Sequence, residues 1–388
     1  MICSLTARRP RTPFPSPLPV LLAAVVACAA PASAQPSLQL APDLTLAVSG
    51  GIQPRVSLGV ERAGLDGADE AVRYGAGIRR ARIQARVLYR DLAGVEYDVE
   101  AGSGTVQSVD LFAFANLSPS VQARVGYFPV AQPRAGILTP YFLIDAVDRA
   151  AIVERWFVGT LGGDGRDLGA DVTYDGGAVR ATLAVHNGAG TFGRSDNNFR
   201  EGISSPDVVN GPETAGLAVS AAVAADVGPG VEVGAFAGAN GADAARTARP
   251  GFVGPDGPAS GEGRGYTTGA AHVYWGAVPG SQPLRLKLDA LALRYADDGA
   301  GDQTLAGVSL LGAARAFPAG EVFARAERYW TDVDADGDTY LTAGASYSPS
   351  AALGAAYHRA RLSLAYQYRD GAVLPDAHLV ILQGQLAF

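Results

Sequence analysis

The stretch Gly77–Asp91 restricts the folds open to this chain more than any other. Taken in steps of two, its residues separate into a polar face interrupted only by Leu88, and an apolar face. The polar face holds Arg80, Arg82, Gln84, Arg86 and Arg90, and the apolar face holds Ala81, Ile83, Ala85, Val87 and Tyr89. Successive side chains of a strand point to opposite sides of a sheet, so the pattern predicts a strand with one cationic face. That strand fits a soluble sandwich, with its arginines in bulk water, or a membrane barrel, with its arginines in a wet lumen.

The following segment alternates in the same way with the opposite charge. Glu96, Asp98 and Glu100 share one face, opposite Val95, Tyr97 and Val99. A hairpin through Asp91–Gly94 would place this acidic column beside the arginine column, where opposite charges on neighbouring strands stabilise each other. A single charged row is also explained by a solvated sheet face, but the repeated alternation of later segments favours the barrel.

The amino terminus has the pattern of a secretory signal peptide, residues 1–34. Arg8, Arg9 and Arg11 precede the apolar run Leu18–Ala30, and Ala32-Ser33-Ala34 forms a small-residue cleavage site. The apolar run is too short to span a bilayer as a helix. One alternative stays open: Val25-Val26-Ala27-Cys28 resembles a lipoprotein cleavage box, which would leave Cys28 acylated.

Composition excludes several classes of function. The two cysteines, Cys3 and Cys28, both lie in the signal region, so the exported chain is expected to have neither a disulfide framework nor a cysteine metal site. The chain has 31 basic and 38 acidic residues, and the three signal arginines leave with the signal, giving a net charge of about −10. Nucleic acid is therefore not an expected partner, and no cofactor is expected.

The remaining chain has no apolar segment of helix length, although 48% of all residues are hydrophobic and 49 are glycine. Transmembrane strands distribute apolar residues by alternation in this way. About 350 residues beyond Ala34, at roughly 22 per strand and turn, give close to sixteen strands. We therefore predict an all-β fold: a disordered segment at 35–43, then a transmembrane antiparallel barrel at 44–388, in contact with the lipids of a Gram-negative outer membrane.

Further strands are expected at intervals of about twenty residues. They are Val106–Leu117, Val121–Phe128, Asp167–Asp175, Ala178–Asn187, Thr214–Asp226, Val231–Asn240, Tyr266–Ala277, Leu284–Tyr295, Thr304–Phe317, Glu321–Thr331, Thr339–Tyr347, Ala352–His358 with Arg361–Arg369, and His378–Phe388. Short turns such as Ser118–Ser120, Gly228–Gly230 and Ser348–Ser350 suit the periplasmic side. The longer segments Pro129–Arg166, Gly188–Glu213 and Gly241–Gly265 suit extracellular loops.

The last strand has a specific ending. Val380, Leu382, Leu386 and the terminal Phe388 share one face. A terminal Phe on an alternating strand is typical of the signal that the outer-membrane assembly machinery recognises.

Several short segments together resemble one known family. They are Ile78–Arg82, Val109–Phe112, Leu117–Val121, Val125–Val130, Phe142–Asp145, Asp148-Arg149, Arg166–Gly169, His186–Gly190 and Asp196–Asn198. Over about Ile78–Arg200 the chain resembles the phosphate-selective porin (porin O and P) family. The resemblance implies a trimeric porin of sixteen strands, with a third loop folded into arginine-lined walls and phosphate among the small anions it passes.

The chain departs from that family where selectivity would be decided. The family's Gln-Phe-Lys is Tyr127-Phe128-Pro129 here, and Pro129–Arg166 contains no lysine. We therefore expect arginines to supply the cations, since the guanidinium fork binds phosphate and carboxylate well. The predicted pore-lining residues are Arg80, Arg82, Arg86, Arg124, Glu96, Asp98 and Glu100, and the predicted constriction residues are Arg134 and Arg149. Alternatively, the loop arginines only pair with acids such as Asp145 or Glu154.

Other motifs give weaker predictions. Asp332–Asp338 resembles the start of a calcium loop, but Ala343 replaces the Glu expected at its twelfth position, which favours a polar turn. The four histidines lack metal-ligand spacing, and His186 with Ser195 is the nearest approach to a hydrolase pair. No catalytic residue is predicted. The sequence thus favours a porin for small hydrophilic solutes with an anion preference, against two alternatives: a weakly selective porin, and a barrel plugged by Pro129–Arg166 with a structural or attachment role.

Overall fold

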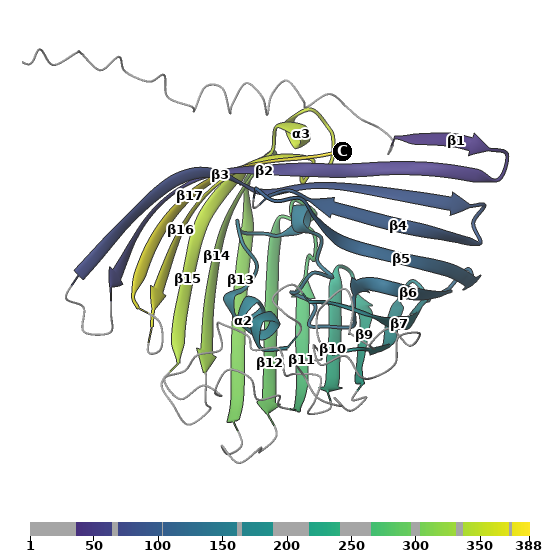
Figure 1. Cartoon of the computed structure of the whole chain (residues 1–388). Helices are drawn as coiled ribbons and strands as arrows, with labels where there is room; N and C mark the ends of the chain where they lie inside the picture. Colours follow the sequence, from purple (N-terminus) through teal and green to yellow (C-terminus); the bar gives the residue numbers. More distant parts are fainter. Residues whose placement is uncertain are drawn as a thin grey trace, which may run out of the picture.

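The computed structural model describes residues 36–63, 69–102, 104–160, 165–188, 217–240, 265–295, 303–330, 337–371 and 375–388. Within these ranges, sixteen antiparallel strands form a closed barrel, because each pairs with the next and β17 pairs with β2 (Figure 1). They are β2 (Leu44–Ala63), β3 (Asp69–Tyr89), β4 (Ala93–Glu100), β5 (Gln107–Ser118), β6 (Val121–Pro129), β7 (Arg166–Asp175), β8 (Val179–His186), β9 (Ala218–Gly228), β10 (Val231–Asn240), β11 (Tyr266–Trp275), β12 (Leu284–Tyr295), β13 (Gln303–Phe317), β14 (Gly320–Trp330), β15 (Asp338–Tyr347), β16 (Ala360–Asp370) and β17 (Ala377–Ala387). The predicted all-β barrel is confirmed.

The strands carry the alternation that the sequence predicts. In β12, Leu284, Leu286 and Leu288 are exposed on the outer face, whereas Arg285 and Lys287 are buried inside. An outer surface of leucine and valine is stable only against hydrocarbon. Among the described residues, no helix is long and apolar enough to cross a bilayer.

A β-bulge in β3, the strand that carries the arginine column, shifts the alternation of its side chains by one residue. Gln53 of β2 lies opposite Arg80 and Pro54 lies opposite Ile78, so Arg79 has no partner in the register. Pro54 has no N–H for the ladder, and bulges accommodate such positions. As a result Arg79 and Arg80, although consecutive, both bond inside the barrel: Arg79 Nε to Asp148 Oδ1 at 3.3 Å and Arg80 Nη1 to Gln53 Oε1 at 3.2 Å.

The prediction of a disordered segment at 35–43 is wrong for Ser37–Ala41, which form strand β1. β1 pairs with the first residues of β2, Ser37 lying opposite Ala47. The last residue, Phe388, exchanges backbone hydrogen bonds with Gly50. β2 therefore continues past the end of β17 and leaves an open edge, which β1 covers.

A second prediction, the strand Ala352–His358, is also wrong. The connection between β15 and β16 begins with the short helix α3 (Pro349–Ala352) and continues through turns to Ala360. Ser348 caps the helix, its Oγ accepting from the N–H of Ala351 at 3.0 Å, and Pro349 occupies the first turn. Both residues favour a helix start over a tight hairpin. The loops predicted at Gly188–Glu213 and Gly241–Gly265 fall mainly outside the described residues, as does the signal peptide.

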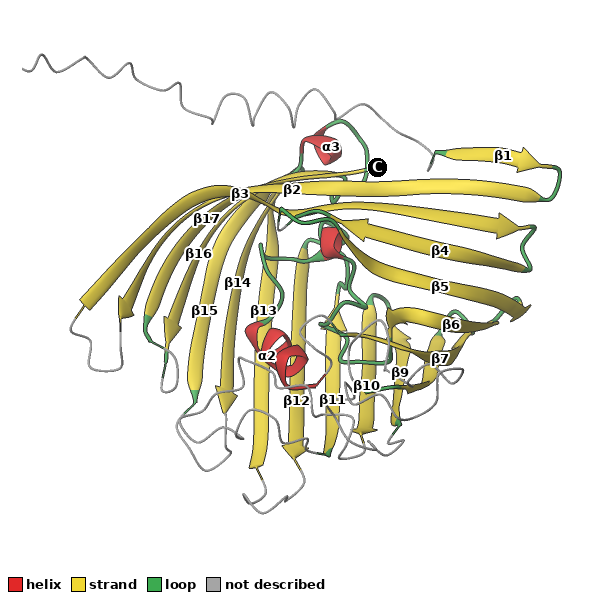
Figure 2. Cartoon of the chain, in the orientation of Figure 1, coloured by secondary structure: helices red, strands yellow, loops and turns green. Residues whose placement is uncertain are grey.

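The segment between β6 and β7 enters the space enclosed by the strands. Its described part, residues 130–160, is called the inner segment below and contains the helices η1 (Tyr141–Leu143) and α2 (Ala151–Thr160) (Figure 2). Its backbone accepts hydrogen bonds from Gln53 of β2, Arg325 of β14 and Arg361 of β16. The inner segment therefore decides how much of the lumen stays open.

Candidate functional site

One side of the lumen is filled by an apolar core. Ile152, Val153, Trp156 and Phe157 of α2 are almost completely buried. They pack among inward-facing side chains of β10–β14: Phe236, Tyr266, Leu293, Leu305 and Tyr329. The Trp156 ring meets Phe236 edge-on, with ring centroids 5.6 Å apart, and its Nε1 donates to Thr268 Oγ1 at 2.8 Å. Such a packed core excludes water, so a hydrated path must run on the other sides of the inner segment.

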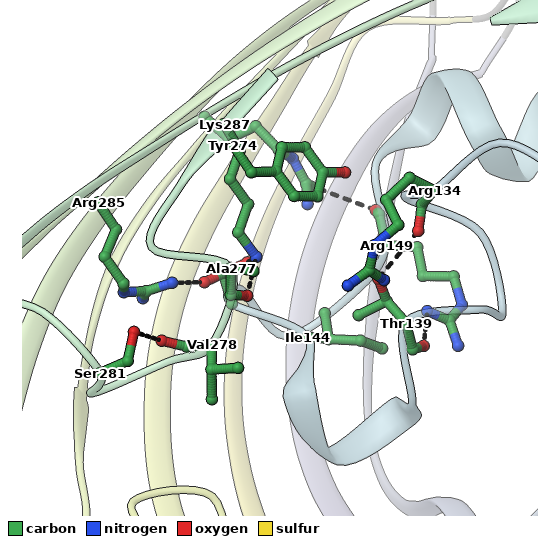
Figure 3. Close-up of polar contacts among 12 residues, drawn as sticks. Arg134, Thr139, Ile144, Arg149, Tyr274, Ala277, Val278, Ser281, Arg285 and Lys287 are labelled. Carbon is green, nitrogen blue, oxygen red and sulfur yellow. Dashed lines mark hydrogen bonds and ion pairs between the residues drawn. The ribbon is translucent and has the colours of Figure 1, made fainter. Parts of the chain in front are cut away.

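A buried charge cluster fixes the inner segment to β12. Asp145 accepts from Arg285 and from Lys287, whose Nζ lies 2.6 Å from Asp145 Oδ2. Lys287 also donates to the carbonyl of Ala277 at 2.7 Å (Figure 3), and Arg285 pairs with Glu321 at 2.9 Å. Every charge in this cluster has an opposite partner, which is the condition for a stable buried ion pair.

A second charge cluster holds the neighbouring turn. Asp148 accepts from Arg55 Nη2 at 2.8 Å and from Arg79 Nε at 3.3 Å. Burial acts to raise the pKa of the Asp148 carboxyl, but the charges of Arg55 and Arg79 outweigh it, so the pKa lies below its ordinary value of 3.8. Asp148 is therefore ionised and keeps the segment docked at neutral pH.

The two predicted charge columns lie side by side. The register places Arg82 opposite Glu100, Gln84 opposite Asp98, and Arg86 opposite Glu96, which confirms the predicted hairpin. Arg82 Nε lies 3.1 Å from Glu100 Oε2, and Arg86 Nε lies 3.7 Å from Glu96 Oε2. The acidic column therefore neutralises much of the arginine column.

The same pairing extends to the next strands. Arg124 Nε donates to Asp171 Oδ1 at 3.0 Å, and its guanidinium lies 4.4 Å from the centroid of the Phe128 ring. Asp98 lies opposite Asp110, which accepts from Arg166 Nε at 2.6 Å. The roles of these wall residues in ion passage stay predictions.

The predicted constriction residues have different environments. Arg134 pairs with Glu232 at 2.8 Å and lines a cavity of about 490 Å³ between the inner segment and β7–β12. Arg149 is mostly buried and donates from Nη1 to the carbonyl of Thr139 at 2.9 Å (Figure 3). Arg149 forms no ion pair with any carboxylate of the described residues.

Arg149 is also a lining residue of two separate cavities. A cavity of about 180 Å³ towards the long-loop side is lined by Glu154, Arg325 and Arg369 as well as Arg149. A larger cavity of about 490 Å³ towards the short-turn side is lined by Arg82, Tyr141 and Phe388 as well as Arg149. Among the residues that the structure describes, Arg149 is the one that lines both. It is therefore the candidate constriction of a path through the barrel.

Sequence reasoning missed the residues that dock the inner segment. Asp145 was considered only as a partner of loop arginines, and Asp148 only as part of the family resemblance, whereas both bind strand cations. A signal for α2 was present: Ile152, Val153, Trp156 and Phe157 have the spacing of one apolar helix face.

The histidine considered for hydrolysis has two partners in the barrel wall. His186 Nδ1 lies 2.8 Å from Asp167 Oδ2, and His186 Nε2 lies 3.1 Å from Ser220 Oγ. The order Ser–His–Asp is that of hydrolase triads. All three side chains are at least 95% buried, and they link the neighbouring strands β7, β8 and β9 within the barrel wall. Ser195 lies outside the described residues.

The calcium-like segment is described only at its end. Residues 331–336 lie outside the described ranges, and Asp338 pairs with Arg155 at 2.9 Å. No group of three or more metal-ligating side chains occurs in the described part of the chain.

Comparisons with known proteins agree on the fold. No protein-family model matches the sequence, and no curated protein sequence matches it. The chain is similar in structure to an anion-selective porin from Comamonas acidovorans (TM-score 0.62, 14% identity, covering 89% of this chain and 100% of that one). It is also similar to a trimer form of OmpT from Vibrio cholerae (0.55, 12%, 89% and 99%) and to the outer membrane channel DcaP of Acinetobacter baumannii (0.56, 13%, 90% and 99%). At these identities the similarity establishes a porin-type barrel fold, and the porin O and P resemblance stays a prediction.

Proposed function

We propose that this protein is an outer-membrane channel through which small hydrophilic solutes diffuse passively, with anions preferred. The observation that carries the proposal is Arg149, which borders a cavity on each side of the inner segment. A cation at a constriction, without a carboxylate to neutralise it, attracts anions and repels cations. The porin-type fold, and the anion-selective porin and outer-membrane channel among similar structures, support this function.

Phosphate and polyphosphate are proposed to pass through the channel without binding to it strongly. Strong phosphate sites present several free arginine forks to one anion. Here Arg82, Arg86 and Arg124 are each paired with a carboxylate. A mild anion preference is therefore the function that this arrangement supports best.

Two terminal segments are proposed to direct export of the chain and its insertion into the outer membrane. Residues 1–34 are proposed as a cleaved signal, and Phe388 as part of the signal for the assembly machinery. Phe388 is about half exposed on the strand end that closes the barrel against Gly50.

We also propose a homotrimer, the form named for one V. cholerae OmpT structure. β4 pairs with β3 only over Arg82–Tyr89, so the part of β3 before Arg82 has no strand partner on this edge in the described structure. In that part of β3, Val72, Tyr74 and Ile78 are exposed. An unpaired strand edge is unfavourable in lipid, so a second copy is the natural cover.

The test is the reversal potential of the refolded protein in a planar bilayer under a potassium chloride gradient. We expect the anion sign, and Arg149→Ala should move the potential towards zero. Arg73→Ala removes the same charge from an exposed position, where the one ion pair with a described residue is that with Glu61 at 3.4 Å, and should leave the potential unchanged. Cation selectivity would mean that the acidic column dominates. Complete absence of current would support the plugged barrel.

A further inference from the structure

The larger cavity beside Arg149 combines flat apolar surfaces with very little free positive charge. Its cationic lining consists of Arg82, Arg124, Arg149, Arg166 and Arg359. Arg82, Arg124 and Arg166 are paired with Glu100, Asp171 and Asp110. Arg149 and Arg359 form no ion pair with the described residues. Two guanidinium groups of the lining therefore have no carboxylate partner in the described part of the chain, and the acid Asp98 of the same lining offsets one of these two charges.

Acidic side chains in the same cavity disfavour a second negative charge. Glu96, Asp98 and Asp110 are part of its lining, and Asp98 lies directly opposite Asp110. Asp98 is buried, and its Oδ1 has no hydrogen-bond partner. A dianion such as hydrogen phosphate would meet this acidic surface, whereas a monoanion can keep its charge at Arg149.

The remaining lining includes several aromatic side chains. Phe142 of the inner segment stacks on His358 of the β15–β16 connection, with ring centroids 5.3 Å apart and planes 27° apart. Tyr141 lies edge-on to Phe142 at 5.3 Å and beneath the guanidinium of Arg82 at 5.3 Å. These rings come from the inner segment and from the wall. Phe142 is the less buried of the two inner-segment rings, and it can pack against a planar ligand in the offset or edge-on arrangement that aromatic pairs favour.

The volume suits such a ligand. At about 490 Å³ the cavity lies within the range of small-molecule sites, which are mainly apolar with a few polar groups that fix orientation.

We propose that this cavity is a binding subsite for aromatic monocarboxylates on the diffusion path. The carboxylate binds the free N–H groups of Arg149, and the ring packs against Tyr141 and Phe142. The inference rests on the proposed channel function and adds the class of its preferred solute. It also predicts that an anion with a single carboxylate and a flat ring binds better than a smaller or more highly charged one.

Two measurements test the subsite separately from conduction. In the first, benzoate, acetate or phosphate is added during chloride conduction through the full protein in a planar bilayer. We expect benzoate to reduce the chloride current at roughly tenfold lower concentration than acetate, because only benzoate uses the aromatic faces. Equal block by benzoate and acetate, or stronger block by phosphate, would overturn the proposal.

The second measurement is calorimetric titration of benzoate into the same protein in detergent, which needs no current. A channel that fails to conduct but binds benzoate would refute the proposed function and retain the subsite. No benzoate binding would refute the subsite, even if the protein conducts.

A variant pair separates the aromatic contact from a general effect on folding. Phe142→Leu keeps apolar bulk but loses the flat face, so benzoate binding should weaken roughly three- to tenfold while acetate is unchanged. Phe317→Leu, at an exposed position on the outer face, is the matched control and should bind benzoate normally. An identical benzoate affinity in both variants would contradict the aromatic contact.

Discussion

Replacing Asp145 with alanine should release the first half of the inner segment while leaving the barrel folded. Asp145 is the shared partner of Arg285 and Lys287. After its removal Arg285 still has Glu321, but Lys287 keeps no carboxylate partner among the described residues and retains the carbonyl of Ala277 and the face of the Tyr274 ring. A buried cation without its carboxylate destabilises the docked state. The substitution should therefore act mainly by leaving the Lys287 ammonium group without an opposite charge.

The expected magnitude follows from that unpaired charge. Removing one partner of a buried ion pair costs about 3–5 kcal/mol. Since about 1.4 kcal/mol corresponds to a factor of ten, the docked state should lose roughly two to four orders of magnitude against the released state. The contacts of Asp148 and Trp156 continue to hold the second half of the segment.

The assay is single-channel recording, with heat resistance of the barrel on a gel as the folding control. Asp145→Ala should give larger and noisier openings at unchanged heat resistance. Asp145→Leu combined with Lys287→Met removes both charges and should restore quiet openings, since an apolar pair replaces the ion pair. Asp43→Ala, which breaks only an exposed pair with Arg90, is the matched control. Openings of Asp145→Ala that match those of Asp43→Ala would refute the tether.

Three further predictions concern the same lumen. Trp156→Ala removes a buried indole and its bond to Thr268, so the docked segment should lose about 3–5 kcal/mol, detected as faster protease cleavage between β6 and β7. Because the pKa of Asp148 is lowered below 3.8, its ion pairs persist above that pH and are lost as pH falls through the lowered pKa. The inner segment should therefore stay docked from about pH 7 to 4.5, and faster protease cleavage between β6 and β7 within that window would contradict the assignment. Glu100→Gln frees Arg82 from its partner and should increase anion selectivity, whereas a shift towards cations would show that Arg82 does not face the path.

The period-two pattern predicted the barrel because one rule, the alternation of side chains, applies to every strand. Val231–Asn240 and Leu284–Tyr295 have the predicted bounds, since Gly230 and Pro283 precede them and the alternation continues through both strands. The rule fails where the backbone departs from it. The bulge at Arg79 shifts the alternation of side chains in β3 by one residue. It becomes visible only in the register with β2, where Pro54 lies opposite Ile78.

The candidate site was less predictable because it depends on contacts between distant segments. The hairpin pairs Arg82 with Glu100 through local register, and the sequence sufficed for that. Asp145 meets Lys287 across the lumen, and no local pattern specifies such a pair. The apolar face of α2 occurs where a porin lumen is expected to be polar, so its residues were not assigned to a core.

Solutes are proposed to pass Arg149, and chemical modification at that position tests this path. A chain that starts at Gln35 contains no cysteine, so Arg149→Cys introduces a single thiol. A negatively charged methanethiosulfonate reagent should then lower the single-channel chloride conductance and the anion preference, while the same label on Arg73→Cys changes neither. If labelled Arg149→Cys keeps the conductance and selectivity of the unlabelled protein, the solute path does not pass Arg149.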